Sequence, residues 1–532
     1  MRPFLAPAFF ALAVASVQPA SAEFTLRILH SNDIHARYDE TAPGGSACTA
    51  KDREAKKCVG GVARLAAKLK ELRTPNAVYL DAGDQFQGTL FYTTYKAQTA
   101  WIFANLLKTD AMALGNHEFD DGPAMLAEFL ANTTFPVLSA NSDASDEPRL
   151  QGKYQPNTIL TVQGQKIGVF GLTTIDTPIT SSPGPTLKFL GEIETARAQV
   201  AALRALGVNK IVALTHIGYG NDLALAKAVD GIDVIVGGHS HSLLESGNLR
   251  SAGPYPTMIA SPSGAPVAIV TAAAYNQYLG QIDVTFDDAG LVTKAEGKAH
   301  FLANAVPMDP VVQAKVAEFA APLEAVRAKP IGTAAVALSG GEALCRFGEC
   351  NLGNLLADAI LASAKPRGAQ VAITNGGGIR SSIPAGDVTL GQVLEVLPFS
   401  NTVAVVTLTG AELRASLEHG LSRAHDPTLS GTGRFPQIAG MRLTWNVGSA
   451  EGQRVRSLEI RQPDGSYRPV DPTASYVVAT NNFMRSGGDG YALMATGRDV
   501  YDFGQNLEDA LAEQFKAGPV SPAVEGRILR AN

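Results

Sequence analysis

Short polar clusters that directly follow apolar, strand-like runs constrain this chain more than any other feature. In open α/β sheets, sites form in the crevice at the carboxyl ends of the strands. We therefore expect the polar side chains of these clusters to lie close together, and five of the nine histidines fall within them. The clusters are residues 32–35, 81–88, 114–120, 215–216 and 237–241.

Residues 23–307 alternate β-rich runs with runs of helical spacing. Residues 24–30 alternate like a strand, whereas residues 61–73 place apolar side chains on one helix face. This alternation predicts an α/β domain whose sheet is covered by helices. Further strands are expected at residues 77–80, 111–114, 167–172, 211–215 and 234–236, and further helices at 100–107, 194–206 and 223–229.

A chain of 532 residues is too long for one ordinary core and predicts two or more domains. Residues 309–328 are typical of a single helix, closed by Lys329-Pro330, and we interpret this helix as the connector between domains. Residues 331–532 are expected to form a second domain of α/β or α+β class. The predicted division is a signal peptide at 1–22, a domain at 23–307, a linker at 308–330 and a domain at 331–532.

The first 22 residues are typical of a bacterial secretory signal peptide. Arg2 provides the positive start, an apolar stretch follows, and Ala20-Ser21-Ala22 matches a cleavage site. The stretch is short for a membrane span, and we find neither another long apolar run nor an apolar anchoring tail. We therefore expect a periplasmic or secreted protein without a membrane anchor.

Composition and cysteine spacing narrow the class of protein further. The net charge of −6 does not suit a protein that binds duplex nucleic acid, which needs a concentrated basic face. In an exported protein, the close pairs Cys48/Cys58 and Cys345/Cys350 predict two local disulfides. The alternative is one zinc site made by all four thiols, but the two pairs are far apart and lack Cys-x-x-Cys spacing.

The side chains in the polar clusters predict a metal centre. Imidazole, carboxylate and amide oxygen together suit zinc, manganese or iron, whereas calcium and magnesium prefer oxygen ligands. The candidates exceed one tetrahedral site, which favours two ions that share a carboxylate. Two ions about 3.5–4 Å apart can activate one water and polarise phosphoryl oxygens. The candidate ligands are Asp33, His35, Asp84, Asn116, His216, His239 and His241.

These clusters resemble the motifs of the calcineurin-like metallophosphoesterases. The matching motifs are Asp33-x-His35, Gly83-Asp84-x-x-Gln87-Gly88, Gly115-Asn116-His117-Glu118, His216 and Gly238-His239-Ser240-His241. The resemblance implies two divalent metal ions bridged by Asp84. The implied ligands are Asp33, His35, Asp84 and His241 for one ion, and Asp84, Asn116, His216 and His239 for the other. In the nucleotidase branch, Gln or Asn can stand at the position of His241.

The same resemblance implies that His117 lies over the phosphate and is paired with Asp120. A histidine there can stabilise developing charge and protonate the leaving oxygen, while Asp120 fixes its tautomer and raises its pKa. Asp120 can also be interpreted as the N-cap of a helix at residues 121–130, which does not exclude the paired role.

The second half of the chain carries side chains suited to a nucleotide. Arg346 and Arg380 are planar, permanently charged groups that suit phosphate or carboxylate. Phe399 and Phe483 can stack on a planar base, and Asp489 can bind a sugar diol. Taken singly, each has an ordinary alternative, because such Phe residues are usually core and such Arg residues are usually on the surface.

Together, these residues resemble the 5'-nucleotidase family over essentially the whole chain after residue 22. Further matching motifs are Gly60-Gly61-Val62-Ala63-Arg64-Leu65, Cys345-Arg346-Phe347-Gly348-Glu349-Cys350 and Pro522-Ala523-Val524-Glu525-Gly526-Arg527-Ile528. The implied fold is an N-terminal four-layer αββα sandwich joined by a linker helix to a C-terminal α/β (α+β) domain. The implied roles are phosphate and ribose contacts by Arg346, Arg380 and Asn375, base stacking by Phe399 and Phe483, and ribose binding by Asp489.

The resemblance implies a secreted dimetal 5'-nucleotidase, with nucleoside di- and triphosphates and nucleotide sugars as further candidate substrates. It also implies that the C-terminal domain rotates to carry substrate to the metals, and we expect a hinge near residues 329–332. A 2',3'-cyclic phosphodiesterase with 3'-nucleotidase activity and a thiosulfate-ester hydrolase are the alternatives on the same scaffold. A non-enzymatic nucleotide-binding module is disfavoured because every expected ligand is present. Zinc, manganese and cobalt all tolerate these ligands, and the sequence leaves the metal, the base preference and the choice between monomer and homodimer open.

Overall fold

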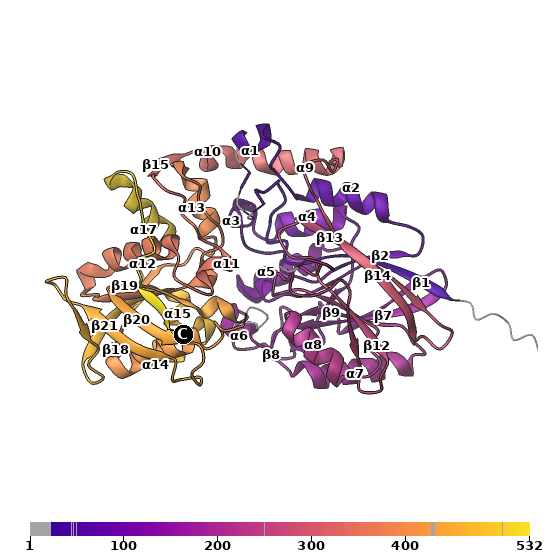
Figure 1. Ribbon diagram of the computed structural model, residues 1–532. Coiled ribbons are helices and arrows are strands. Elements are labelled where there is room, and N and C mark those ends of the chain that lie inside the picture. Colours follow the sequence, from indigo (N-terminus) through magenta and orange to yellow (C-terminus); the bar gives the residue numbers. More distant parts are fainter. Residues whose placement is uncertain are drawn as a thin grey trace, which may run out of the picture.

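The computed structural model describes residues 23–43, 45, 47–48, 50–248, 251–426, 431–502 and 504–531. Two domains lie side by side, and a run of short helices joins them along one side (Figure 1). The predicted signal peptide at residues 1–22 lies outside the described residues. Within the described part of the chain, no helix combines the length and the apolar character that crossing a bilayer requires.

The N-terminal domain is built on two six-stranded sheets. The strands of the first sheet are β1 (Phe24–Ser31), β2 (Ala77–Asp81), β3 (Ala111–Ala113), β4 (Val137–Leu138), β13 (Tyr278–Phe286) and β14 (Val292–Phe301). The strands of the second sheet are β6 (Asn157–Val162), β7 (Gln165–Thr173), β9 (Ile211–His216), β10 (Val234–Gly237), β11 (Thr257–Ala260) and β12 (Pro266–Val270). Their spatial orders are β14-β13-β1-β2-β3-β4 and β11-β12-β10-β9-β7-β6. A small sheet pairs β5 (Ser142–Asp143) with β8 (Lys188–Phe189).

The two large sheets share one apolar core. Leu26 and Ile28 of β1 belong to the same buried cluster as Val169 of β7 and Val212 of β9. The central strands run parallel in both sheets, from β1 to β4 and from β7 through β9 and β10 to β12. Parallel strands covered on both faces read as nearly continuous apolar runs, which is the pattern the sequence carries before each polar cluster.

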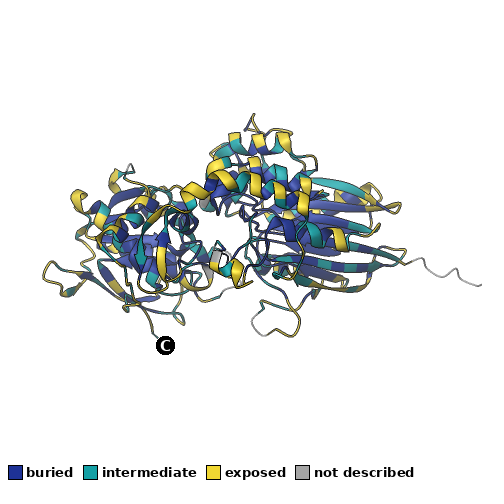
Figure 2. Cartoon of the chain, turned by 90° about the horizontal axis from the view of Figure 1, so that it is seen from above, coloured by how far each residue is buried: buried dark blue, intermediate teal, exposed yellow. Residues whose placement is uncertain are grey.

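Helices cover the outer faces of both sheets, which completes the predicted αββα sandwich. Figure 2 shows buried strands inside this domain and helices exposed on their outward sides. The helices on the first sheet are α2 (Val62–Leu72), α3 (Leu90–Tyr95), α4 (Gln98–Leu106) and α5 (Gly122–Asn132), and those on the second are α7 (Glu192–Ala205) and α8 (Tyr219–Ala228). Shorter helices are α1 (Ala50–Glu54), η1 (His117–Phe119) and α6 (Thr177–Thr180).

All strands and helices predicted in this domain are present, with ends shifted by a few residues. Helix α8 begins earlier than expected because Gly218, with φ of 88°, lets the chain turn directly into Tyr219. The strands that were not predicted are β4, β5, β6, β8, β11, β12, β13 and β14. Most residues of β14 are exposed or half-buried, so this edge strand carries little of the apolar alternation that reveals a strand.

The connector is not the single helix predicted at residues 309–328. Helix α9 (Pro310–Ala320) begins at the N-cap Asp309 and is followed by the 3₁₀ turn η2 (Ala321–Leu323) and by α10 (Glu324–Arg327). Pro322 lacks the N–H that would continue the α-helical hydrogen bonds, which accounts for the interruption. Val312 and Val316 of α9 are buried in the core of the N-terminal domain.

The C-terminal domain contains mixed sheets, as expected for an α+β domain. Its strands are β15 (Pro330–Ala334), β16 (Val371–Asn375), β17 (Gly386–Thr389), β18 (Val403–Thr409), β19 (Pro436–Ala439), β20 (Met441–Asn446), β21 (Val455–Arg461), β22 (Tyr467–Pro469), β23 (Ser475–Asn481), β24 (Arg498–Tyr501) and β25 (Ile528–Ala531). The main sheet has the order β19-β16-β23-β18-β24, a second sheet has the order β22-β21-β20-β25, and β15 pairs with β17. Residues 330–332 of the expected hinge therefore lie within strand β15, which is paired with β17.

Helices cover both faces of the main sheet. The helical segments are α11 (Glu342–Cys345), α12 (Asn351–Ala364), η3 (Lys365–Arg367), η4 (Gly376–Gly378), α13 (Leu390–Val396), α14 (Gly410–Leu421), η5 (Thr432–Arg434), α15 (Asn482–Arg485), η6 (Gly488–Gly490), α16 (Ala492–Ala495), α17 (Leu507–Gln514) and η7 (Phe515–Ala517). Helices α12, α13 and α17 share one core with this sheet, and α14 shares another with the second sheet. Helix α10 of the connector lies against α13, so the break at Pro322 separates segments that pack on different domains.

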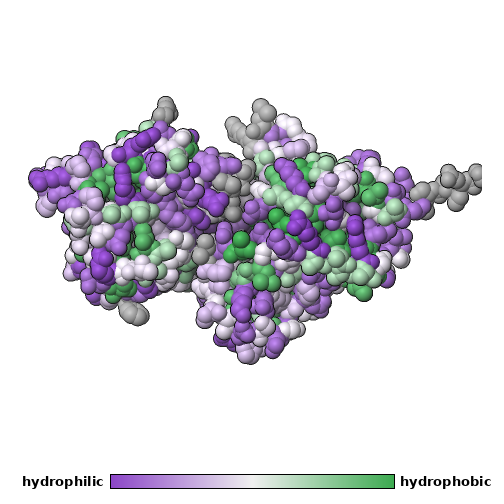
Figure 3. All heavy atoms as spheres, turned by 90° about the horizontal axis from the view of Figure 1, so that it is seen from below, coloured by the Kyte–Doolittle hydropathy of each residue, from purple (hydrophilic) through white to green (hydrophobic). Residues whose placement is uncertain are grey.

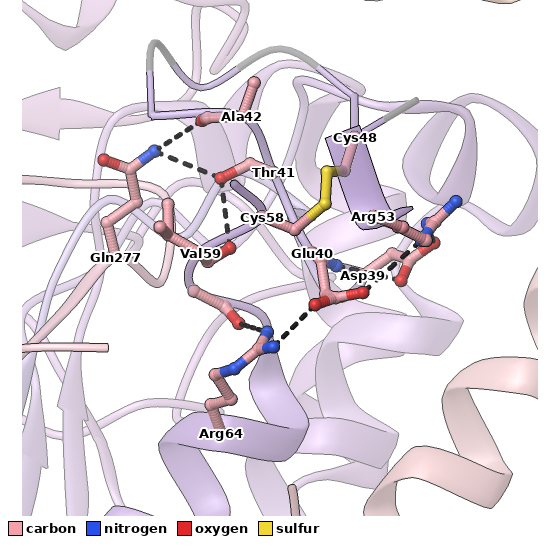
Figure 4. The surroundings of a disulfide bond; sticks show 11 residues. Asp39, Glu40, Thr41, Ala42, Cys48, Arg53, Cys58, Val59, Arg64 and Gln277 are labelled. Carbon is pink, nitrogen blue, oxygen red and sulfur yellow. Dashed lines mark hydrogen bonds and ion pairs between the residues drawn. A yellow bond between two sulfur atoms is a disulfide. The ribbon is translucent and has the colours of Figure 1, made fainter. Parts of the chain in front are cut away.

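Both predicted disulfides are confirmed, Cys48–Cys58 and Cys345–Cys350, and the four-thiol zinc site is therefore excluded. Figure 4 shows the first disulfide beside a group of ion pairs. Arg64 Nη2 lies 2.7 Å from Glu40 Oε1, and Arg53 Nη2 lies 3.1 Å from Asp39 Oδ2. These contacts hold the disulfide-closed segment against α2.

The face of the molecule seen in Figure 3 is mostly hydrophilic, with hydrophobic residues in small groups over both domains. This distribution is ordinary for a globular surface, and single exposed apolar side chains need no special explanation.

Candidate active site

The five polar clusters meet at the carboxyl ends of strands from both sheets of the N-terminal domain. Asp33, Asp84 and Asn116 follow β1, β2 and β3 of the first sheet. His216 ends β9 of the second sheet, and His239 follows β10. The candidate centre therefore lies where the two sheets come together.

Sharp turns of the chain aim these side chains inward. Several non-glycine residues adopt positive φ, a region that is uncommon for such residues and that clusters at functional sites. The values are 52° for Asp33, 50° for His35, 59° for Asp84, 78° for His239 and 51° for His241. Gly115 provides the room these turns need, because a Cβ atom there would lie 2.2 Å from Asp84 Oδ1.

Carboxylate oxygens and imidazole nitrogens of the cluster face one another at short range. His241 Nε2 lies 3.2 Å from Asp33 Oδ1 and 3.1 Å from His35 Nε2. His216 Nε2 lies 3.0 Å from Asp84 Oδ2. Ligand atoms within 4.8 Å of one another form three groups, namely Asp33/His35/His241, His35/Asp84/His117 and Asp84/His216/His239. The seventh predicted ligand, Asn116, has Oδ1 2.9 Å from His239 Nδ1.

The hydrogen bonds around this cluster suit metal ligation. His35 Nδ1 lies 3.1 Å from the carbonyl oxygen of Phe86, and His216 Nδ1 lies 2.6 Å from that of Ala82. A carbonyl accepts, so Nδ1 carries the proton in both rings and the Nε2 lone pair is available to a metal. Burial lowers the pKa of His239 to about 3, which keeps that ring in the neutral, metal-binding form. The donor set fits two divalent ions that share Asp84.

Glu118 belongs to a predicted motif, but the sequence did not assign it a role. Its fully buried carboxylate accepts hydrogen bonds from the backbone N–H groups of Asp84 at 3.0 Å, Gln85 at 2.7 Å, Phe86 at 3.3 Å and Gly115 at 2.7 Å. Burial and the nearby Asp84 raise the pKa of Glu118 to about 7. The carboxylate thus joins the loop after β2 to the loop after β3. The signal in the sequence was an acidic residue within the motif that begins at Gly115.

His117 and Asp120 form the predicted pair, with His117 Nδ1 2.7 Å from Asp120 Oδ2. Burial lowers the pKa of His117, but attraction to the Asp120 and Asp84 carboxylates outweighs it, so this pKa is raised above its ordinary value. The N-cap alternative for Asp120 is wrong. Helix α5 begins at Gly122 with Asp121 in the N-cap position, which leaves the Asp120 side chain directed to His117.

A cavity between the two domains joins this centre to the predicted nucleotide residues. From the N-terminal domain it is lined by Asp84, Asn116, His117, Asp120, His239 and His241, and from the C-terminal domain by Arg346, Asn375, Arg380, Phe399, Phe483 and Asp489. All six residues predicted to bind substrate therefore face one space. Asp33, His35 and His216 are not among the residues that line this cavity and are 0–1% exposed.

The C-terminal side chains lie directly against the candidate metal centre. The Phe399 ring stacks on the His117 ring with centroids 5.7 Å apart and an interplanar angle of 23°. Arg380 Nη2 is 3.3 Å from His35 Nε2. Binding groups and candidate catalytic groups are therefore in contact in this arrangement of the domains.

Asn375 contacts Asp489 rather than lying free beside the arginines. Its Nδ2 donates to Asp489 Oδ2 at 2.6 Å, and Asn481 Nδ2 donates to Asn375 Oδ1 at 3.0 Å. Asp489 itself has φ of 55°, a strained conformation held by these neighbours. Asn375 thereby orients the carboxylate that the sequence assigned to the ribose.

Phe483 lies flat on the turn η6. A Cβ atom on Gly488 would come within 2.6 Å of the Phe483 ring, so a glycine is needed for this contact. Other cavity-lining residues were given no role from the sequence, either because their motif was assigned only to its metal ligand, as for Gln87, or because they lie in short helical turns and loops. They include Gln87, Thr180, Ser181, Asn401, Thr432 and Gly433.

We predict that Glu118→Gln weakens metal binding by about 10- to 100-fold, the usual effect of removing a hydrogen-bonded partner behind metal ligands. The amide NH₂ of Gln would face backbone N–H groups that now donate to a carboxylate. Calorimetric titration of metal-stripped protein with Zn²⁺ measures this. Glu418→Gln is the matched control, because Glu418 accepts from the backbone N–H groups of Arg454 and Val455 outside the cavity. Equal losses in the two variants would contradict the prediction.

Comparison with known proteins agrees with the geometry. The family model for calcineurin-like phosphoesterases matches residues 26–243, and that for the 5'-nucleotidase C-terminal domain matches residues 330–496. Snake venom 5'-nucleotidase of Naja atra is 38% identical over 533 residues, covering 95% of this chain and 98% of the relative. Human 5'-nucleotidase is 38% identical over 549 residues, covering 98% of this chain and 94% of the relative.

The fold comparison leads to the same family. The crystal structure of a 5'-nucleotidase precursor from Thermus thermophilus matches with a TM-score of 0.90 at 41% identity, covering 96% of this chain and 100% of that one. One known architecture therefore accounts for both domains. The chain belongs to the 5'-nucleotidase family of calcineurin-like phosphoesterases, which are metal-dependent phosphoester hydrolases.

Proposed function

We propose that this protein is a secreted 5'-nucleotidase that hydrolyses nucleoside 5'-monophosphates to nucleoside and phosphate with two divalent metal ions. The observation that carries the proposal is the single cavity in which the clustered Asp and His side chains face two Arg, two Phe and one Asp of the other domain. Relatives named 5'-nucleotidase that align over nearly the whole chain support the same function.

Asp33, His35, Asp84 and His241 would hold one ion, and Asp84, Asn116, His216 and His239 the other. Zinc is the favoured metal, with manganese and cobalt as alternatives, because imidazole and carboxylate ligands suit all three. When bound, such a pair supplies a nucleophilic water at neutral pH and positive charge next to the phosphoryl oxygens.

The chain's own residues then orient the phosphate and the leaving group. Arg380, whose Nη2 lies 3.3 Å from His35 Nε2, and Arg346, which lines the same cavity, would hold phosphoryl oxygens. Water adds to phosphorus, the P–O5' bond breaks, and the leaving oxygen takes a proton from His117. Because Nδ1 of His117 is held by Asp120, Nε2 is the nitrogen that delivers this proton. One proton of the water stays on the phosphate, and the other is released to solvent, from which His117 is protonated again.

Phe399 and Phe483 would stack on the base, while Asp489 would accept hydrogen bonds from the ribose hydroxyls. Stacking tolerates any aromatic base, so we expect a broad base preference and activity on further nucleotides, including di- and triphosphates or nucleotide sugars. The two arginines and two phenylalanines favour this function over a cyclic phosphodiesterase or a thiosulfate-ester hydrolase on the same scaffold.

We predict that the purified mature protein releases phosphate from AMP faster than from 3'-AMP or 2',3'-cyclic AMP. A chelator should abolish release, and Zn²⁺ or Mn²⁺ should restore it, because the predicted ligands have no other way to activate water. A colorimetric phosphate assay across these substrates, with and without chelator, measures both effects. Faster release from the 3' or cyclic ester would overturn the proposed base and ribose contacts.

We further predict that His117→Ala lowers kcat for AMP by about 10²- to 10⁴-fold, the usual contribution of a general acid. Metal content should not change, because His117 is assigned no ligand role. Metal analysis and steady-state kinetics on the same sample test this. His300→Ala, on strand β14 with Nε2 2.9 Å from Gln281 Oε1, is the control and should match the unmodified protein. Loss of metal with unchanged turnover per loaded centre would show that His117 is a ligand instead.

A further inference from the structure

We propose that Ser181 is a positioning residue of the reaction, whose hydroxyl fixes the Asp120 carboxylate and thereby orients His117 toward the leaving oxygen. The inference rests on the proposed function, in which His117 protonates that oxygen. Ser181 belongs to no motif and was not singled out by its sequence context.

The geometry links three side chains in a row. Ser181 Oγ donates to Asp120 Oδ1 at 2.6 Å, and Asp120 Oδ2 lies 2.7 Å from His117 Nδ1. Each oxygen of the carboxylate therefore has its own partner. Ser181 is 9% exposed, and all three residues line the cavity between the domains.

A second hydrogen bond changes how well the carboxylate can hold the imidazole. The terminal torsion of an Asp side chain is broad, so one bond to His117 would leave the carboxylate free to turn. A hydroxyl that donates to the other oxygen restricts this rotation, and bonds to a charged acceptor are stronger than neutral ones. This restriction fixes the orientation of the His117 ring in the cavity where the phosphate would bind.

The backbone around Ser181 is itself well anchored. Ser181 directly follows helix α6, and its N–H donates to the carbonyl of Thr177 at 3.0 Å. Thr177 Oγ1 donates to Thr174 O at 2.7 Å, and Thr174 N–H donates to the carbonyl of the candidate ligand His216 at 2.9 Å. The hydroxyl is therefore presented from a segment tied to the candidate metal centre.

Helix α6 also lies against η6, the turn of the C-terminal domain that carries Asp489. The element that presents Ser181 to Asp120 is thus the element that meets the proposed ribose-binding turn. The same short helix therefore contacts the C-terminal domain and leads into the residue that binds Asp120. Ser181 thus connects the orientation of His117 to the contact between the domains.

The test compares substrates with different leaving groups, using the full mature chain loaded with metal. Ser181→Ala should lower kcat for AMP about 10-fold, the effect of losing one hydrogen bond to a charged group, with little change in KM. It should slow nitrophenyl phosphate much less, because nitrophenolate leaves without needing a proton. Ser181→Thr keeps the hydroxyl and should stay near the unmodified rate, whereas Ser181→Val, of the same shape as Thr, should behave like Ser181→Ala.

Ser261→Ala is the matched control, because Ser261 Oγ donates to Asp230 Oδ1 at 2.8 Å in the same domain and lies outside the cavity. It should leave both rates unchanged. A double-mutant cycle adds a second readout, since Ser181→Ala should cause no further loss once Asp120→Ala is present.

Equal slowing of both substrates, an additional loss in the Asp120→Ala background, or an unchanged rate in Ser181→Ala and Ser181→Val would each overturn the inference. Failure of the proposed function looks different, because the unmodified protein would then release no phosphate from AMP whatever residue stands at position 181.

Discussion

The active site depends on how the Asp84 carboxylate is held between the two sheets. Its Oδ2 lies 3.0 Å from His216, which ends a strand of the second sheet, and its Oδ1 accepts the backbone N–H of His117 at 2.9 Å. Gly115 leaves the space that the carboxylate occupies, and Glu118 binds the backbone on both sides. Because this buried carboxylate contacts groups from both sheets, the cluster forms only when both sheets are packed together.

The second domain completes a site that the first domain cannot form alone. Phe399 stacks on His117, and Arg380 reaches His35, so groups suited to a base and a phosphate lie directly over the cluster. The connector between the domains breaks at Pro322, between a helix buried on one domain and a helix packed on the other. Under the proposed function, recognition of the substrate and chemistry on it would be joined through the contact of the two domains.

The sequence predicted the clusters well because each combined a buried parallel strand with polar residues at its end. Asp33, His216 and His239 could be found in this way, since parallel strands buried on both faces are plainly apolar. Glu118 and Ser181 could not be assigned roles, because their importance comes from backbone amides and from a carboxylate brought together only by folding. Strand β14 was not predicted because most of its residues are exposed or half-buried. The connector was predicted as one helix because its residues favour helix throughout except at Pro322.

We propose that Asp84 is shared by two metal ions, and the metal content per chain tests this sharing most directly. Metal-stripped protein, reloaded with Zn²⁺ and desalted, is analysed by plasma mass spectrometry beside Asp84→Asn, whose neutral amide oxygen is a much weaker metal ligand than a carboxylate oxygen. We expect two ions per chain in the unmodified protein and one or none in the variant. Two tightly held ions in Asp84→Asn would contradict the proposed sharing.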